Sequence, residues 1–462
     1  MTPERAQDIF DRLKKFSDAD EMELNLSSVN GTLTRFANNT IHQNVAEQGM
    51  VVNVRLAFDG KTASASTNKL DDESLRRAVQ AARALCEVQE HDPDLLPMIS
   101  QSEAAELAKS KLVPNRHFES TATAGPQERA DGVEKMVAVA KRHGQISAGV
   151  FAISENDEAI LNSRGLHQFH RQTLAEVSIT MTGTDSSGWQ KHCSTDVKDL
   201  DPAAIAEDAA RRSVESARPR ELEPGKYTVI LEPSAVLDTI GAMFFDFGAL
   251  SVIEQRSFLN KRLGTKLFGE NISIRDDAYH PLQSGEPFDG EGTPRQAVQL
   301  VANGVIRDLV YARASVPRML RSEEAASAGN VKVTGHGFPL PNEMGDAPLH
   351  IVFDTPENPV TVDQMIAGTD RGILVTRVWY IREVDPYEKI VTGMTRDGTF
   401  LVENGRIVGG IRNFRFNQSL IELLNHVEAM SLPVRASGEE AFDMVVPAMK
   451  VHGFNFTEVT KF

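Results

Sequence analysis

The residues that could hold a zinc ion are few and do not form a peptidase signature. A zinc peptidase commonly presents two histidines one helical turn apart, with a glutamate beside the first to activate the metal-bound water. The chain contains twelve histidines and two cysteines, and no histidine is followed by a glutamate. The sequence therefore offers no zinc-peptidase motif of this type.

Two local pairs of residues are of types that can bind a metal ion. His167 and His170 lie in a strand-like stretch with no carboxylate between them, and His192 stands beside Cys193. Neighbouring side chains of an extended chain point to opposite faces, so His192 and Cys193 are not expected to converge on one ion. We expect structural roles for these residues, and Cys86, on the apolar face of a predicted helix, to be a core thiol.

A glycine-flanked acidic loop is the other candidate for cation chemistry. Asp289 and Glu291 lie between glycines in the stretch 288–292, and their oxygens are of the kind that hard cations prefer. Two carboxylates two residues apart in a loop are more often solvated. We therefore expect a solvent-exposed loop here, with a cation site as the alternative.

Composition limits the classes of partner. The formal net charge is −16, which opposes direct contact with nucleic-acid phosphates, because such binding depends on clustered lysine and arginine. Two cysteines cannot build a disulfide framework, and no apolar stretch reaches the roughly 20 residues that span a bilayer. The N-terminus opens a charged amphipathic segment and not a signal peptide. We expect a soluble, cytoplasmic protein without a membrane anchor.

The elements that must position any site begin with residues 1–90, predicted as an N-terminal α/β segment. Helical spacing of apolar residues predicts a helix over 3–16 and another over 71–86. Between them, Asn30-Gly31 predicts a tight turn in a β-hairpin, and Asp59-Gly60 predicts a second one, because both pairs favour left-handed backbone conformations.

The remaining chain divides at two polar stretches. Residues 91–125 are rich in proline and polar residues and are predicted as a connector, followed by a second α/β segment over 126–218. A linker with two prolines and a glycine then leads into 222–462, where alternating runs separated by Asn-Gly and Asp-Gly turns predict a β-rich domain. The predicted fold class is α+β.

Several motifs, in this order, resemble the TldD/PmbA family, and its PmbA (TldE) branch more than its TldD branch. The resemblance covers nearly the whole chain. The motifs are Arg35-Phe36-Ala37-Asn38-Asn39-Thr40-Ile41-His42-Gln43, Leu231-Glu232-Pro233-Ser234-Ala235, Arg256-Ser257-Phe258-Leu259, Phe288-Asp289-Gly290-Glu291-Gly292, Thr334-Gly335-His336-Gly337 and Pro447-Ala448-Met449-Lys450-Val451.

This resemblance implies an N-terminal α/β region joined to a barrel-like C-terminal domain. It also implies an assembly in which a zinc-bearing TldD-like metallopeptidase subunit pairs with a PmbA-like subunit to process peptides. Zinc-bearing members carry His-Glu-x-x-x-His on the helix after the first C-terminal strand and a cysteine near the C-terminus. Residues 236–247 contain no histidine and no cysteine follows Cys193, so we expect no zinc and no catalytic residue in this chain, and zinc in the partner.

The role left for such a subunit is to hold an unfolded peptide, for which strand addition to a sheet edge is the expected mode. The alternating stretch Leu349-His350-Ile351-Val352-Phe353 lies between prolines, as edge strands often do. The predicted peptide-binding set consists of His336, His350, Ile351, Val352 and Phe353. The other interpretation of the stretch is an ordinary strand of the barrel-like domain.

Two alternative functions stay open at this stage. The chain could be a divergent zinc peptidase active as a homodimer, with zinc held by His336, His350 or His452 and nearby acids. It could also be a non-enzymatic modulator that binds a protein partner. The acidic charge argues against direct DNA contact but not against a protein partner.

Overall fold

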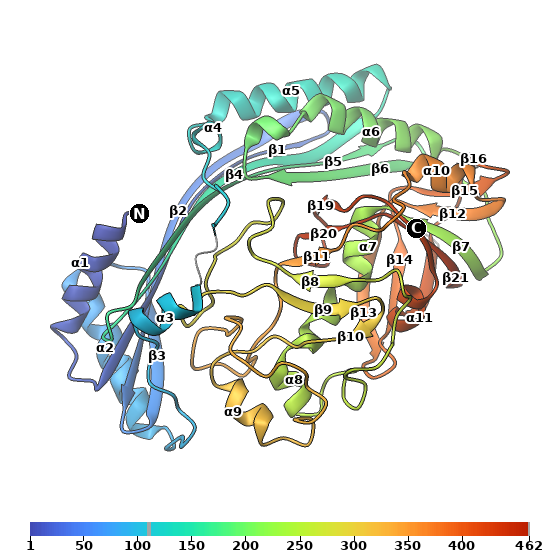
Figure 1. Ribbon diagram of the computed structural model, residues 1–462. Coiled ribbons are helices and arrows are strands. Elements are labelled where there is room, and N and C mark those ends of the chain that lie inside the picture. The colour runs from blue at the N-terminus through green and yellow to red at the C-terminus, as the bar shows by residue number, and fades with distance from the viewer. Residues whose placement is uncertain (109–111, 461–462) are drawn as a thin grey trace.

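Three β-sheets and the helices packed on them make up the computed structural model of the protein, which describes residues 1–108 and 112–460 (Figure 1). The predicted α+β class is therefore confirmed. Residues 109–111 of the predicted connector 91–125 lie outside the described residues. The described part of the chain has no helix with both the length and the apolar character needed to cross a membrane.

The first sheet is antiparallel and bends in an arc around the C-terminal half (Figure 1). Its strands come from the predicted segments 1–90 and 126–218, with β1 paired to β4 across the connector. In sheet order, the strands are β3 (Lys61–Thr67), β2 (Thr40–Phe58), β1 (Glu21–Ala37), β4 (Ile146–Asn162), β5 (His167–Thr182) and β6 (Ser187–Ser194).

Helices cover the two ends of the outer face of this sheet (Figure 1). At one end α1 (Pro3–Lys14) and α2 (Asp72–Val88) bury their apolar stripes, and at the other end α5 (Pro126–Arg142) and α6 (Pro202–Glu215) do the same. Thr2 caps α1 before Pro3, as its sequence predicts. The shorter helices of this half are α3 (Gln101–Ala108), α4 (Glu119–Ala122) and η1 (Val197–Asp199).

The predicted hairpin turn at Asn30-Gly31 is wrong. Residues 21–37 form one continuous strand, β1, paired along nearly its whole length with β2 on one side and β4 on the other. The turn lies at Asn38-Asn39, where both residues adopt left-handed φ values of 51° and 58°. Pairing on both sides outweighs the turn preference of the Asn-Gly dipeptide, because each residue of a central strand satisfies its backbone groups in the sheet.

The C-terminal half contains a six-stranded and a nine-stranded sheet around one large apolar core. In order, the six-stranded sheet contains β10 (Val305–Ile306), β9 (Val298–Ala302), β8 (Ile274–Asp276), β11 (Ile351–Phe353), β20 (Met444–Val446) and β19 (Val434–Ala436). The nine-stranded sheet contains β13 (Val378–Asp385), β14 (Ile390–Thr395), β17 (Phe414–Ser419), β21 (Met449–Val459), β7 (Gly225–Leu231), β12 (Arg371–Val375), β15 (Thr399–Glu403) and β16 (Arg406–Gly410), with β18 (Val427–Met430) beside β21.

The helices of this half are short. They are α7 (Pro233–Ile240), η2 (Gly241–Phe247), α8 (Ala249–Ile253), α9 (Ser315–Leu320), α10 (Val362–Ala367) and α11 (Leu420–Asn425). A closed barrel, which the resemblance implied, is not found among the described strands: each C-terminal sheet has two end strands that do not pair with each other. Closure requires such pairing, so both sheets are open.

Side chains of the first sheet bind the C-terminal half directly. The Asn25 amide donates to the carbonyl of Gly290 at 3.2 Å, and the Ser187 hydroxyl donates to Asp397 at 2.7 Å. These bonds link β1 and β6 to loops more than 200 residues later in the chain. The inner face of the arc is therefore held against the C-terminal half.

Candidate functional site

The helix directly after β7 is the position where the resemblance would place zinc ligands. In this chain α7 is buried, and its one ionisable side chain, Asp238, is 2% exposed. The Asp238 carboxylate accepts hydrogen bonds from the backbone N–H groups of Glu439, Glu440 and Ala441 at 2.9–3.2 Å. Burial raises the pKa of Asp238 to about 6, against the opposing effect of these bonds. Its oxygens are thus used to anchor the 439–441 loop.

The acidic residue of η2 is engaged in the same way. Asp246 accepts from the Lys389 ammonium at 2.9 Å and from the backbone N–H of Phe258 at 3.0 Å. Within residues 1–108 and 112–460, no group of three or more His, Cys, Asp or Glu side chains is placed to hold a metal ion. The side chains of α7 and η2 therefore do not fit the zinc ion that zinc-bearing members of the family hold at this position, and no hydrolytic step is assigned to a metal here.

Two of the predicted site residues, His336 and His350, meet at one buried carboxylate. The Nε2 atom of His336 lies 2.9 Å from Oδ1 of Asp276, and its Nδ1 atom lies 2.9 Å from the Thr334 hydroxyl. The other Asp276 oxygen accepts from the backbone N–H of His350 at 2.7 Å. The side chains of His336 and Asp276 are fully buried. This arrangement joins β8 to the segment before β11.

The imidazole of His350 makes the cluster sensitive to pH. It is 4% exposed, and its Nδ1 atom has no hydrogen-bond partner among the described residues. Burial, together with the positive charge of Arg295, lowers the pKa of His350 to about 3. The folded protein therefore keeps this ring neutral at pH values where the unfolded chain takes up a proton.

We expect stability to fall as the pH drops from about 6.5 towards 3, because the unfolded state then binds more protons than the folded state. One group contributes at most about 1.4 kcal/mol per pH unit. In His350→Gln, the free energy of unfolding in urea should depend less steeply on pH, and the difference in slope should correspond to at most one proton. His350→Asn should reproduce that slope, whereas equal losses at every pH would indicate a packing defect and contradict the assignment.

The predicted peptide-binding residues Ile351, Val352 and Phe353 form β11, which is an internal strand of the six-stranded sheet. β11 pairs with β8 on one side and with β20 on the other, so the expectation of an open edge is wrong. The three side chains are at most 2% exposed. An unbroken apolar run with both faces covered is typical of a central strand. Strand addition at β11 would first require breaking its existing pairs.

The acidic loop at 288–292 is buried, so the expectation of a solvated loop is wrong. Asp289 is 2% exposed and accepts from the backbone N–H groups of Glu291, Thr293 and Gly337 at 2.8–3.0 Å. Burial and the Asp289 charge raise the pKa of Glu291 to about 7. The loop is bound to β1 through the Asn25 amide, and Gly290 lets it pack against the segment 338–339, since a Cβ at residue 290 would lie 2.3 Å from the backbone of Pro339.

The two remaining pairs from the sequence do not form ligand sets. His167 and His170 are three residues apart on β5, which places them on opposite faces of the strand. On β6, the Cys193 thiol donates to Asp443 at 2.8 Å and accepts from Arg435 at 3.2 Å. Burial raises the pKa of Cys193 to about 11, which disfavours the reactive thiolate.

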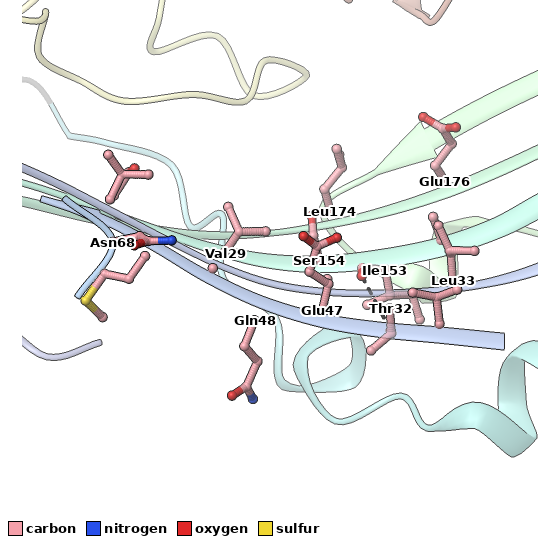
Figure 2. Close-up of a pocket in the computed structure, with 17 residues that line it drawn as sticks. Val29, Thr32, Leu33, Glu47, Gln48, Asn68, Ile153, Ser154, Leu174 and Glu176 are labelled. Atoms are coloured by element: carbon pink, nitrogen blue, oxygen red, sulfur yellow. Dashed lines mark hydrogen bonds between the residues drawn. The ribbon is translucent and has the colours of Figure 1, made fainter. Parts of the chain in front are cut away.

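A groove on the inner face of the first sheet was missed by the sequence reasoning. It has a volume of about 760 Å³, and Figure 2 shows Leu174 and Glu176 rising from one side of the sheet while Gln48 projects from the other. Val29 and Val51, 43% and 47% exposed, contribute apolar surface. The signal for this groove was the apolar residues at alternate positions of β1. It was not recognised, because the wrongly predicted turn at Asn30-Gly31 split this strand in two.

The fold and the site are those of one class of protein. A curved antiparallel sheet packs around a C-terminal half of two sheets, and the carboxylate of the helix after β7 is hydrogen-bonded within the chain. The PmbA/TldA metallopeptidase C-terminal domain matches residues 224–458, domain 1 matches residues 22–86, and the central domain matches residues 119–217. The chain belongs to the PmbA/TldD metallopeptidase family.

Individual relatives are distant. An uncharacterised protein from Methanocaldococcus jannaschii is 29% identical over 158 residues, which cover 33% of this chain and 36% of that protein. A metalloprotease from Methanothermobacter thermautotrophicus is 23% identical over 333 residues, which cover 67% of this chain and 69% of that protein. The first match thus spans little more than a third of that relative's length.

Solved structures match over nearly the whole chain. TldE from Thermococcus kodakarensis has a TM-score of 0.84 at 18% identity and covers 98% of this chain and 99% of its own. A proposed modulator of a DNA gyrase from Thermotoga maritima has a TM-score of 0.82 at 19% identity and covers 98% and 100% of the two chains. At these identities the likeness shows the fold.

Proposed function

We propose that this protein is a TldE-like subunit of a cytoplasmic, peptide-processing metallopeptidase assembly and has no zinc site of its own. The main support is that Asp238 of α7 and Asp246 of η2 both use their carboxylates to bind other parts of the chain. The whole-chain likeness to a TldE supports the same role. A TldD-like partner then supplies the zinc and the chemistry.

The contribution of this chain is to hold an unfolded peptide on the inner face of the first sheet. The groove offers apolar surface from Val29, Leu33 and Leu174, with the carboxylate of Glu47 beside it, while Glu176 is paired with Lys191 at 3.4 Å. Apolar area gives affinity without sequence specificity, and Glu47 favours peptides that carry lysine or arginine. This surface replaces His336 and β11 as the proposed peptide contact, because those residues are buried.

Metal content and activity test the proposal. We expect the purified chain to contain no stoichiometric zinc and to leave an unfolded peptide intact, while its complex with a TldD-like subunit hydrolyses the peptide. Leu174→Glu should slow hydrolysis by the complex roughly tenfold or more if this side chain is a central contact. The control Val384→Glu, at a 59% exposed position on β13, should not. Tightly bound zinc together with hydrolysis by the chain alone would overturn the proposal.

The homodimeric zinc peptidase is the second candidate. His336 and His350 share Asp276, but His452 lies on β21, where its ring contacts Glu428 at 2.6 Å and Thr228 at 3.0 Å. Under this alternative, alanine at any of the three histidines abolishes hydrolysis by the chain alone.

The third candidate, a modulator of a protein partner, is favoured by the name of the Thermotoga protein. This third candidate predicts that the chain binds its protein partner and that no complex containing the chain hydrolyses peptides.

A further inference from the structure

A second, smaller cavity lies between the inner face of the first sheet and the loops of the C-terminal half. Its volume is about 260 Å³. We call it the Arg295 cavity. The residues that line it are Asn25, Glu158, Ile160, Glu286, Phe288, Asp289, Gly290, Arg295, His336, Gly337, Phe338, Pro339 and Leu349.

One wall carries a buried cation without a carboxylate partner. Arg295 is 5% exposed, and in the described part of the chain no carboxylate oxygen lies within 4.0 Å of its guanidinium nitrogens. One nitrogen donates to the carbonyl of Gly335 at 3.3 Å, and Nε has no partner. The positive charge of Arg295 acts to lower the pKa of Asp289 and Asp276, but the oxygens of both carboxylates are bound to other donors. A buried guanidinium in this state favours an anionic ligand.

Another part of the lining carries two unpaired acids. The side-chain carboxyl groups of Glu158 on β4 and of Glu286 in the loop before Phe288 have no hydrogen bond or ion pair with any described residue. Burial, followed by the charges of Glu286 and Asp157, raises the pKa of Glu158 to about 8. Arg116 also faces Glu286, but its guanidinium donates to the carbonyls of Gly285 and Ala278. A cationic donor near the two glutamates would relieve their repulsion.

The polar groups available for binding are therefore a donor at Arg295, two carboxylates, and the side-chain oxygen of Asn25, which also has no partner. Arg295 lines the cavity from a loop of the C-terminal half, whereas Glu158 lines it from β4 of the first sheet. The third acid of the lining, Asp289, is already bound by three backbone N–H groups. Mixed charge disfavours a phosphate or a bare metal ion. It matches a ligand with one anionic and one cationic end.

We propose that the Arg295 cavity binds a small zwitterion, a free amino acid or a dipeptide, with its carboxylate at Arg295 and its ammonium at Glu158 and Glu286. The volume supports this class, since drug-sized ligands usually occupy roughly 300–1,000 Å³. The apolar walls formed by Ile160, Phe288 and Leu349 accommodate a small side chain. This inference does not rest on a metallopeptidase partner and holds for the chain alone.

Calorimetric titration of the full chain with dialanine tests the proposal. We expect saturable binding of dialanine or of free alanine at millimolar concentrations. Blocking either end should weaken the binding about ten- to a hundredfold, because each blocked end loses a charge-assisted hydrogen bond. The matched probes are N-acetyl-dialanine, which lacks the ammonium, and dialanine amide, which lacks the carboxylate.

Variants then assign each end of the ligand to its residues. Arg295→Gln should weaken dialanine binding and remove the preference for dialanine over its amide, whereas Arg295→Lys should retain part of it. Glu158→Gln should instead remove the preference over the N-acetyl form. Glu158 is partly exposed, so this variant remains informative if Arg295→Gln fails to fold. Absence of saturable binding of both dialanine and free alanine, or binding that is unchanged when either end of dialanine is blocked, would overturn the proposal.

Discussion

Replacing Arg55 by alanine should lower the free energy of unfolding by about 3–5 kcal/mol, one of the largest effects expected for a single substitution in this protein. Arg55 on β2 lies opposite Glu23 on β1, and two of its nitrogens bind the two carboxylate oxygens at 3.0 Å each. The two side chains are only 3% and 1% exposed. Removing the guanidinium leaves a buried carboxylate without its partner, which is far more costly than losing a solvated ion pair.

Urea unfolding followed by tryptophan fluorescence measures this loss. The double variant Glu23→Leu/Arg55→Met should recover most of it, because an apolar pair of similar volume removes both buried charges together. Lys266→Ala is the matched control, since the Lys266 and Glu270 side chains are 54% and 83% exposed and such pairs contribute little. If Arg55→Ala unfolds like the control, the pair does not stabilise the sheet.

A turn could be predicted from the sequence where the two strands on either side of it pair with each other. Asn303-Gly304 and Asn404-Gly405 divide strands that pair with each other, and both Asn residues adopt the predicted left-handed φ. Asn30-Gly31 has the same local preference but lies where β1 is paired on both sides. The deciding partner of β1 on its second side is β4, which begins more than 100 residues later and leaves no local signal in the sequence.

The sequence informs about the site mainly through a residue type that is missing. The lack of histidine in 236–247 is visible in the sequence, and it is the reason why we expect no family-type zinc site on α7 and η2. The contacts that replace it are not visible, because Asp246 binds Lys389 across 143 residues and Asp238 binds Glu439 across 201. The same reason explains why β11 was misjudged, since its partners β8 and β20 are both distant in sequence.

Replacing Asp276 by alanine is the second substitution expected to have a large effect, also about 3–5 kcal/mol. Asp276 lies on β8 opposite Ile351 of β11, and its carboxylate accepts from both His336 and the backbone of His350. Alanine leaves these buried groups without a partner in the middle of the six-stranded sheet. Asp276→Asn keeps the shape and one acceptor and should cost less, about 1–3 kcal/mol. Asp370→Ala, at an exposed position without side-chain bonds, should change little.

The pH dependence separates the charge of Asp276 from its packing. Although burial acts to raise its pKa, the neighbouring His336 holds the pKa of Asp276 well below its ordinary value. A depressed carboxylate pKa stabilises the fold above the unfolded pKa of about 4, and this contribution is lost as the pH falls through that region. The difference in unfolding free energy between wild type and Asp276→Asn should therefore shrink below about pH 4. A difference that stays constant with pH would mean that Asp276 acts through shape alone.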